Sequence, residues 1–340
     1  HNIKGEGLKD HKSLSSLTNK PSLCFSDVKG QEGIKRAMEV AAAGGHNILL
    51  IGPPGAGKTM ISKRLPSILP EMNFQEALET TKIHSVAGIL ETHGLLCQRP
   101  FRSPHHSISD VALVGGGSFP QPGEISLAHN GVLFLDELPE FKKGVLEVLR
   151  QPLEDRKITI SRAKYTISYP ASFMLVASMN PSPSGHFSQQ NTLYDSNAQE
   201  AQRYVSKISG PLLDRIDIQL EVQAVSYEKL SDTSFSETSA VILERVQKSR
   251  DIQLKRFKTI EGVFHNAQMD VNEIQAFCVL NDESQLIIKA AMKRLRFSAR
   301  AYSRIIKVAR TIADLEGAID IQSVHIAEAI QYRTMDRNTY

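Results

Sequence analysis

Short apolar runs alternate with stretches of helical period from residue 25 to about residue 222, a pattern typical of an α/β unit. Continuous apolar runs at 48–51, 132–135 and 173–177 predict short buried strands. The run 216–222 instead alternates apolar and polar residues with a period of two, which predicts a strand near the edge of the sheet. We therefore expect an α/β fold in this part of the chain.

A different β pattern occupies residues 157–169. Two short β-prone runs, 158–160 and 165–167, flank a turn that contains Arg162 and Lys164. The pattern predicts a β-hairpin with a basic tip. Such a tip is either a contact for the phosphates of a nucleic-acid backbone or an ordinary solvated turn, and the sequence favours neither.

Only helical patterns follow Ser226, so we place the boundary between the α/β unit and a smaller helical unit near this residue. Expected helices, several opened by Ser, Asp or Asn caps, lie at 240–257, 271–280, 283–295, 299–315 and 323–333. The Ser/Thr-rich stretch 231–239 predicts a connecting loop, and polar residues 1–22 predict a linker or arm. The polar run 182–202 has no readable period and predicts a long loop or a short element.

Composition narrows the class of protein. Hydrophobic residues make up 41% and charged residues 23% of the 340-residue chain, which excludes disordered, collagen-like and coiled-coil classes. No apolar run approaches the roughly 18 residues that a membrane span needs, so we expect no membrane partner. The net charge of +3 is too balanced to indicate a nucleic-acid partner by itself.

Cysteine usage and the first residue add two expectations. Cys24, Cys97 and Cys278 form no CxxC pair, which disfavours a disulfide framework and favours a reducing, cytoplasmic setting. Because the chain begins at His1 and not at Met, we expect it to be a fragment of a longer protein.

The sequence from Gly52 to Thr59 matches GxxxxGK[ST] in full, between a predicted buried strand and a helical stretch. Glycines let backbone N–H groups turn inward around phosphate oxygens, and the N-terminus of the following helix adds its dipole. Lys58 supplies a positive charge for the β- and γ-phosphates, and Thr59 supplies a hydroxyl for Mg²⁺. These residues predict a nucleotide site, and a chance glycine-rich turn is the weaker alternative.

Two acids follow the predicted strand 132–135. Asp136 can hold the Mg²⁺ shell, and Glu137 can polarise an attacking water. The alternative is a pair of acids that open a surface turn before Pro139. Because Glu137 can serve a water and no acceptor-binding motif is visible, a hydrolytic nucleoside triphosphatase is favoured over a phosphotransferase.

Three further polar residues have both a functional and an ordinary interpretation. Asn180 follows the predicted strand 173–177 and either orients a water near the γ-phosphate or opens a turn before a proline. Arg215 stands between two aspartates and, taken alone, predicts a local ion pair. Arg300 opens a predicted helix and, taken alone, predicts a solvated helix face.

Taken together, these motifs resemble an AAA+ ATPase, with Walker A at 52–59, Walker B at Asp136 and Glu137, and sensor 1 at Asn180. Longer motifs resemble the magnesium-chelatase ChlI-like subgroup, over nearly all of the chain from about residue 23 to 333. They are Arg102–His106, Gly115–Gly117, Gly123–Gly131 and the dipeptide Ser161-Arg162. The fold that the resemblance implies is a P-loop AAA+ α/β domain of three layers at 23–225, followed by an all-helical lid domain at 226–340.

The resemblance also implies roles for individual residues. Arg215 matches the arginine finger, which acts on the nucleotide of a neighbouring subunit, and Arg300 matches sensor 2, with Arg304 as the second candidate. Catalytic residues would then be Glu137, Lys58, Asn180, Arg215 and Arg300. ATP and Mg²⁺ are the implied cofactors, the metal being held by Thr59 and Asp136. The nucleotide-binding set is Val28, Gly30, Gly52, Pro53, Pro54, Gly55, Ala56, Gly57, Lys58, Thr59, Met60 and Asp136.

The resemblance also implies the partners of this chain. Proteins of this kind form hexameric rings, carry a Lon-protease-like domain before the region matched here, and include helicases that drive branch migration of DNA. The resemblance places a helix-2 insert at about 84–125 and a pre-sensor-1 hairpin at about 157–169, both facing the channel of such a ring, so that Arg162 and Lys164 would contact DNA. The alternatives are a motor that remodels a protein partner, as in magnesium chelatase and MoxR-type relatives, and a scaffold that binds ATP without hydrolysis. The cysteine pairs that often follow sensor 1 in such relatives are replaced by serines at 182 and 184, so we expect no zinc there.

Overall fold

The structure is a computed structural model, and it describes residues 23–90, 94–117, 120–161, 166–183, 196–226 and 236–333. Four sequence predictions lie wholly or mostly outside these ranges: the arm at 1–22, the hairpin tip with Arg162 and Lys164, most of the polar run 182–202, and most of the connecting loop at 231–239.

A five-stranded sheet, parallel throughout, forms the centre of the molecule, with the strand order β2-β5-β8-β1-β9. The strands are β1 (Ile48–Ile51), β2 (Phe101–Arg102), β5 (Val132–Leu135), β8 (Met174–Met179) and β9 (Ile218–Glu221). All four strands predicted from the sequence are present, and β9 is an edge strand as its alternating pattern indicated. The fifth strand, β2, has two residues, which is too short to produce a periodic signal.

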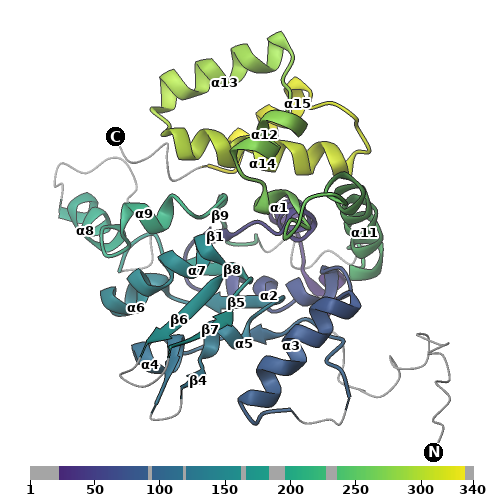
Figure 1. Cartoon of the computed structure of the whole chain (residues 1–340). Coiled ribbons are helices and arrows are strands. Elements are labelled where there is room, and N and C mark those ends of the chain that lie inside the picture. Colours follow the sequence, from purple (N-terminus) through teal and green to yellow (C-terminus); the bar gives the residue numbers. More distant parts are fainter. Residues whose placement is uncertain are drawn as a thin grey trace, which may run out of the picture.

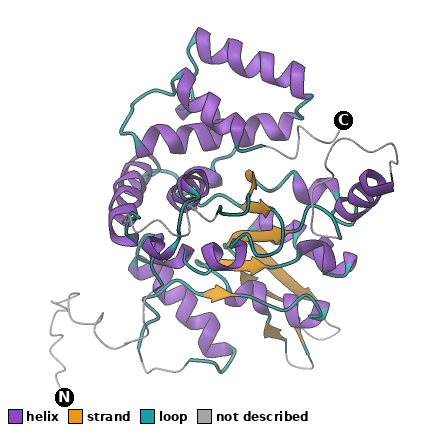
Figure 2. Cartoon of the chain, turned by 180° about the vertical axis from the view of Figure 1, so that it is seen from behind, coloured by secondary structure: helices purple, strands orange, loops and turns teal. Residues whose placement is uncertain are grey.

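Both faces of the sheet are buried at its three central strands, which explains why β1, β5 and β8 are apolar runs. Successive residues of a strand point to opposite faces, so Leu50 belongs to one hydrophobic cluster and Leu49 to the other. The first cluster includes α1 (Glu32–Gly44) and the second includes α6 (Lys143–Val148). Figures 1 and 2 show the sheet between these helical layers. The predicted three-layer AAA+ α/β fold is confirmed.

Further helices precede, connect and follow the strands of this part of the chain. Those before β5 are η2 (Phe25–Asp27), α2 (Lys58–Ser62), η3 (Leu65–Ile68), α3 (Phe74–Val86), α4 (Asp110–Val114) and α5 (Glu124–Leu127). Those after β5 are η4 (Leu138–Glu140), α7 (Arg150–Asp155), α8 (Ser196–Val205) and α9 (Gly210–Leu213).

The region after β9 contains helices and no named strand among its described residues. Its elements are α11 (Ser239–Arg256), η5 (Asn266–Gln268), α12 (Val271–Phe277), α13 (Asp282–Leu295), α14 (Ala299–Leu315) and α15 (Ser323–Gln331). The predicted polar caps are present: Ser298 accepts a hydrogen bond from the Ala301 N–H at 3.1 Å, and Asn281 accepts one from Ser284 at 2.8 Å. Such caps satisfy backbone donors that the first helical turn leaves free.

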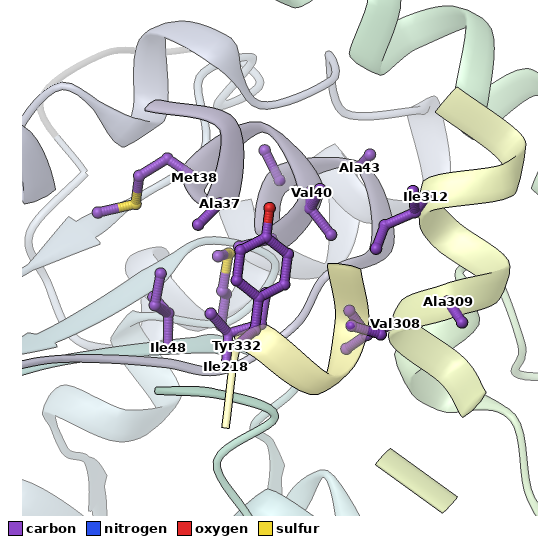
Figure 3. Close-up of a cluster of buried hydrophobic side chains, with 14 of the residues drawn as sticks. Ala37, Met38, Val40, Ala43, Ile48, Ile218, Val308, Ala309, Ile312 and Tyr332 are labelled. Carbon is purple, nitrogen blue, oxygen red and sulfur yellow. The ribbon is translucent and has the colours of Figure 1, made fainter. Parts of the chain in front are cut away.

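The helical region packs on α1 and on the edge strand. Val308 and Ile312 of α14 share one apolar cluster with Val40 of α1 (Figure 3). Tyr332 is 6% exposed in the same cluster, and its carbonyl accepts a hydrogen bond from the Gln219 N–H of β9 at 2.6 Å. The contacts with α1 and β9 determine where the residues of α14 lie relative to the sheet.

Two small antiparallel ribbons lie outside the main sheet. The predicted hairpin is confirmed as β6 (Lys157–Ser161) paired with β7 (Thr166–Pro170), and β3 (Gly115–Gly116) pairs with β4 (Gln121–Pro122). The range 84–125, which the resemblance assigns to an insert, contains β2, and β2 belongs to the main sheet. We therefore restrict the proposed insert to the β3–β4 ribbon between α4 and α5.

The polar run at 182–202 contains the beginning of a short helix. Helix α8 begins at Ser196 and ends at Val205, so the second of the two predictions, a short element, describes this part of the run, and the sequence did not indicate that the element is a helix. Within its described residues Tyr204 is the one apolar side chain in the hydrophobic core, at 4% exposure. A single buried position cannot produce a visible helical period.

Candidate functional site

The phosphate loop follows β1 at the carboxyl end of the sheet, and α2 begins directly after it. Gly57 has a φ of 85°, a left-handed conformation that favours glycine. A Cβ at Gly52 would lie 2.1 Å from the Val222 carbonyl oxygen, so this position has no room for a side chain. These two positions explain why glycines stand there.

Lys58, the first residue of α2, is held by three acceptors. Its Nζ donates to the carbonyl oxygens of Gly52 at 2.7 Å and Pro53 at 2.9 Å, and to Asn180 Oδ1 at 3.1 Å. Burial lowers the pKa of Lys58, and the carboxylates of Asp136 and Glu137 oppose that shift. The structure thus brings together the predicted Walker A lysine and the predicted sensor 1 amide.

Asp136 lies at the end of β5, beside Thr59. The Thr59 hydroxyl donates to Asp136 Oδ2 at 2.7 Å, and the Ser178 hydroxyl of β8 donates to the other carboxylate oxygen. A hydroxyl and a carboxylate are oxygen donors of the kind that Mg²⁺ prefers, so the residues present fit that ion. Within the described ranges no group of three or more His, Cys, Asp and Glu side chains could hold a metal ion by itself.

Glu137 stands apart from this network. Its φ is 54°, and its side chain is 55% exposed, so the carboxylate reaches away from the buried end of β5. The His106 Nε2 lies 4.0 Å from Glu137 Oε2. An exposed carboxylate beside the phosphate loop is placed to contact a water.

The segment at 28–31 lies against the phosphate loop. Val28 is 1% exposed and Gly30 has a φ of 61°. The Gln31 amide donates to the carbonyl oxygens of Ala56 at 2.9 Å and Gln223 at 3.2 Å. This side chain ties the segment to the loop and to the residues after β9, so the predicted neighbours of the base flank the predicted phosphate site.

Arg215 lies at the other end of the sheet. Strands β1 and β9 are neighbours and parallel, with Ile48 opposite Ile218. Lys58 follows β1, whereas Arg215 precedes β9, so at least the length of a four-residue strand, roughly 13 Å, separates their backbones. The Arg215 guanidinium donates to the Pro211 carbonyl oxygen at 2.7 Å and pairs with Glu154. The structure therefore does not bring Arg215 to the phosphate loop of its own chain.

Arg300 lies near Arg215 and not near Lys58. Its guanidinium lies 3.5 Å from Asp214 Oδ2, one residue before Arg215, and its side chain is 61% exposed. Arg304, the second sensor 2 candidate, instead pairs at 3.0 Å with the fully buried carboxylate of Asp217. That partner makes Arg304 a structural residue, so Arg300 stays the better candidate.

Comparison with known proteins identifies the family. A family profile described as "Magnesium chelatase, subunit ChlI" matches residues 24–230, and one described as "Magnesium chelatase, subunit ChlI C-terminal" matches residues 236–333. The chain belongs to the ChlI-like family of AAA+ proteins. The resemblance seen in the sequence motifs is thereby confirmed.

Comparison with individual proteins shows which members of the ChlI-like family this chain is similar to. Competence protein ComM of Haemophilus influenzae is 50% identical over 327 residues, which are 96% of this chain and 63% of that protein. The protein YifB of Escherichia coli is 48% identical over 314 residues, 92% of this chain and 61% of the relative. The magnesium-chelatase 38 kDa subunit of Rhodobacter capsulatus is 26% identical over 186 residues, 50% of this chain and 53% of that one. The ChlI-like chain thus spans about three fifths of the length of ComM and YifB.

Sequence reasoning missed three residues of the ChlI-like site: Ser178 on Asp136, His106 near Glu137, and Glu154 on Arg215. Ser178 had a signal, because it lies two residues before Asn180 and so points to the same face of the strand. His106 and Glu154 come from segments whose approach depends on tertiary packing.

Among the described residues, none of the helices is long and apolar enough to span a bilayer.

Proposed function

We propose that the chain is the ATP-hydrolysing part of a ring motor of the ComM type that acts on DNA. One observation carries the proposal: Lys58 and Asp136 lie at one end of the sheet, and Arg215 lies at the other. A single chain therefore holds both halves of a nucleotide site without joining them. Adjacent copies in a ring would join the halves.

In this proposal the carboxyl end binds the nucleotide. The loop at 52–57 cradles the phosphates with its N–H groups, and Lys58 neutralises the β- and γ-phosphates. Thr59 and Asp136, whose oxygens lie 2.7 Å apart, hold Mg²⁺, which neutralises charge on the phosphate oxygens when bound. The segment at 28–31 lies beside the base and supports ATP as the nucleotide.

Two polar side chains, Glu137 and Asn180, activate the attacking water in this proposal. Glu137 is exposed and therefore free to accept a proton from an attacking water. Asn180 already touches Lys58 and lies where it can orient that water against the γ-phosphate. Both side chains come from the same chain as the phosphate loop.

The neighbouring subunit supplies positive charge, which stabilises the negative charge on the phosphate oxygens in the transition state. Arg215 and Arg300 lie together at the amino end of the sheet and act on the nucleotide of the next copy. Arginine fingers contribute about 10³–10⁵ in rate. A ring, by analogy a hexamer, is then required for turnover.

DNA as the substrate is supported by the identity to ComM and by the β6–β7 hairpin. Ile158 and Ile160 anchor the hairpin in the core, while Thr159 and Ser168 on its outer side are exposed. Its strands end at Ser161 and Thr166, so the basic residues Arg162 and Lys164 occupy the connection between them. A protein-remodelling motor is the second candidate, favoured by the likeness to the magnesium-chelatase subunit.

Mixing two inactive variants tests the shared site. Lys58→Ala removes the phosphate lysine and leaves Arg215, whereas Arg215→Ala does the reverse. Each full-length variant alone should hydrolyse almost no ATP, and an equimolar mixture should recover a substantial fraction of the wild-type rate. A mixture as inactive as its components would contradict a site shared between subunits.

The DNA substrate needs its own measurement. ATP hydrolysis by the full-length protein should rise when forked or four-way junction DNA is added, and the rise should fall steeply with salt because phosphate contacts release counterions. The double variant Arg162→Ala, Lys164→Ala should lose the stimulation and keep the basal rate. Stimulation that is unchanged in the double variant would contradict the hairpin contact.

A further inference from the structure

A cavity lies at the amino end of the sheet, away from the phosphate loop. It measures about 240 Å³ and is lined by Gly131 and Ser172, which precede β5 and β8. Arg156 at the end of α7 lines it from the α/β part, and Arg250 of α11 and Arg304 of α14 line it from the helical region. The cavity therefore lies between the two parts of the chain.

Two of the acidic side chains around this cavity already have guanidinium partners. Glu76 accepts from the Arg99 guanidinium at 3.0 and 3.1 Å, and Asp217 pairs with Arg304 at 3.0 Å. Glu79 lies 3.3 Å from His129, whose pKa is lowered by burial, so that Glu79 keeps its negative charge at neutral pH. Glu76 and Asp217 thus pair with Arg99 and Arg304, and not with Arg156 or Arg250.

Two of the lining arginines have only carbonyl partners among the described residues. Arg250 is 8% exposed, and it donates to Ala42 O at 3.1 Å and Ala43 O at 3.3 Å. Arg156 donates to Gln268 O at 3.1 Å and Gly262 O at 3.4 Å. Burial and the Arg99 charge lower the pKa of Arg250 to about 9 against an opposing effect of Glu76, so the guanidinium still carries its charge at neutral pH. Arg250 is thus a buried positive charge whose hydrogen bonds go to carbonyl oxygens, and the half-buried Arg156 adds a second charge with the same kind of partners. A bound anion would offset the cost of burying such charges.

A histidine adds an unpaired polar atom to the same wall. His265 lines the cavity, and its Nδ1 is buried without a hydrogen-bond partner. Burial first, and then the charges of Arg250 and Arg156, hold the pKa of His265 well below its ordinary value. A neutral imidazole carries one N–H, which a phosphate oxygen can accept.

From this arrangement we propose that the cavity binds a small phosphate-bearing anion through Arg156, Arg250 and His265. Its volume of about 240 Å³ is below the roughly 300–1,000 Å³ of pockets that hold larger ligands, which favours inorganic phosphate or pyrophosphate over a nucleotide. The bound anion would join the α/β part to the helical region and so stabilise their packing. The proposal does not depend on ATP hydrolysis.

The test measures pyrophosphate and phosphate binding by calorimetry on full-length Lys58→Ala protein, which lacks the phosphate lysine of the ATP site. We expect saturable binding and a melting temperature that rises with ligand concentration, because the ligand binds the folded state. Adding Arg156→Gln should weaken the affinity about ten- to a hundredfold, the usual effect of losing one charged hydrogen bond. Arg245→Gln is the matched control, since Arg245 lies on the same helix as Arg250 but pairs with Glu39 and Glu237.

Arg250→Gln is a second variant, and its melting temperature without ligand reports whether the fold survives. The ring nitrogens of ¹⁵N-labelled His265 provide a local readout, because they should shift on binding in the Lys58→Ala protein and stay unchanged after Arg156→Gln. Equal affinity in Arg156→Gln and Arg245→Gln, or no shift at His265 under saturation, would overturn the proposal.

Discussion

The two ends of the sheet differ in charge and in exposure. At the carboxyl end Lys58 lies among Asp136, Asn180 and the exposed Glu137, the residues that we propose bind a nucleotide and a water. At the amino end arginines predominate, and Arg304 pairs there with the buried Asp217. In our proposal one end carries out chemistry on a bound phosphate, and the other presents positive charge to a neighbouring copy.

The position of the helical region produces this difference. After β9 the chain packs α11 and α14 onto α1, and α14 meets the amino end of the sheet through Arg304 and Asp217. Arg300, one turn earlier on α14, is thereby placed beside Asp214 and far from Lys58. If the helical region packed over the phosphate loop instead, Arg300 would lie at the proposed nucleotide site of its own chain.

The largest effect is expected from Arg215→Ala, which tests whether the amino end takes part in catalysis at all. We expect ATP turnover to fall about 10³–10⁵-fold while ATP affinity stays within a few fold, since the guanidinium acts on a neighbour's transition state. Arg245→Ala is the control for removing a guanidinium. Steady-state hydrolysis and binding of a fluorescent ATP analogue measure both quantities. Normal turnover would remove the amino end from the reaction.

Glu137→Gln should have the next largest effect, at the carboxyl end. The amide cannot accept a proton, so hydrolysis should fall about 10²–10⁴-fold while ATP stays bound. Glu140→Gln, three residues later and paired with Lys207 at 3.6 Å, should hydrolyse ATP at the normal rate. Single-turnover measurements separate hydrolysis from release, and equal loss in both variants would contradict a specific role for Glu137.

Asp217→Asn tests whether the buried charges of the amino end hold the fold together. Burial raises the pKa of Asp217, but Arg304, His46 and the Asn47 N–H outweigh it and hold the pKa below its ordinary value. Removing this charge should lower the free energy of unfolding by about 3–5 kcal/mol, as for other broken buried pairs. Asp214→Asn, at the exposed Arg300, should lower it by less than about 1 kcal/mol.

The stability that the Asp217–Arg304 pair contributes depends on pH in a direction that the pKa of Asp217 defines. Because the folded pKa of Asp217 lies below the unfolded value of about 3.9, its stabilisation is present above that pH and is lost as the pH falls through the folded value. Urea unfolding at several pH values should therefore show a smaller loss of stability in acid for Asp217→Asn than for the wild type. Parallel acid profiles would contradict the assignment.

The smallest effect is expected from Lys307→Met, also at the amino end. Burial, and then the Arg304 charge, lowers the pKa of Lys307 to about 8. The pKa of Lys307 in the unfolded chain is about 10.4. Between about pH 8 and that value Lys307 is protonated in the unfolded chain and largely neutral in the folded one. The free energy of unfolding therefore rises with pH in this window, by up to about 1.4 kcal/mol per pH unit. The difference between wild-type and Lys307→Met profiles should show that slope, and Lys248→Met, an exposed control, should show none.

Much of the site was predictable because its parts are contiguous in sequence. The loop at 52–59, the acids after β5 and the amide after β8 each follow a strand directly, and parallel strands deliver their carboxyl ends to one edge. The pairing of Ser178 with Asp136 and of Glu154 with Arg215 was not predictable, because each joins segments whose separation depends on packing. The helical type of α8 was not predictable because its described residues contribute one core side chain, Tyr204.

The amino-acid sequence alone predicted the family and the α/β class, both of which are confirmed, and the residues that we propose for the phosphate site, because a motif's chemistry depends on neighbours along the chain and strand burial depends on local apolar runs. Only the tertiary structure decided that Arg215 and Arg300 lie together at the far end of the sheet, and that Arg156 and Arg250 line one cavity. Those placements depend on strand order and on how α14 packs against α1, which are set by contacts between residues far apart in the chain.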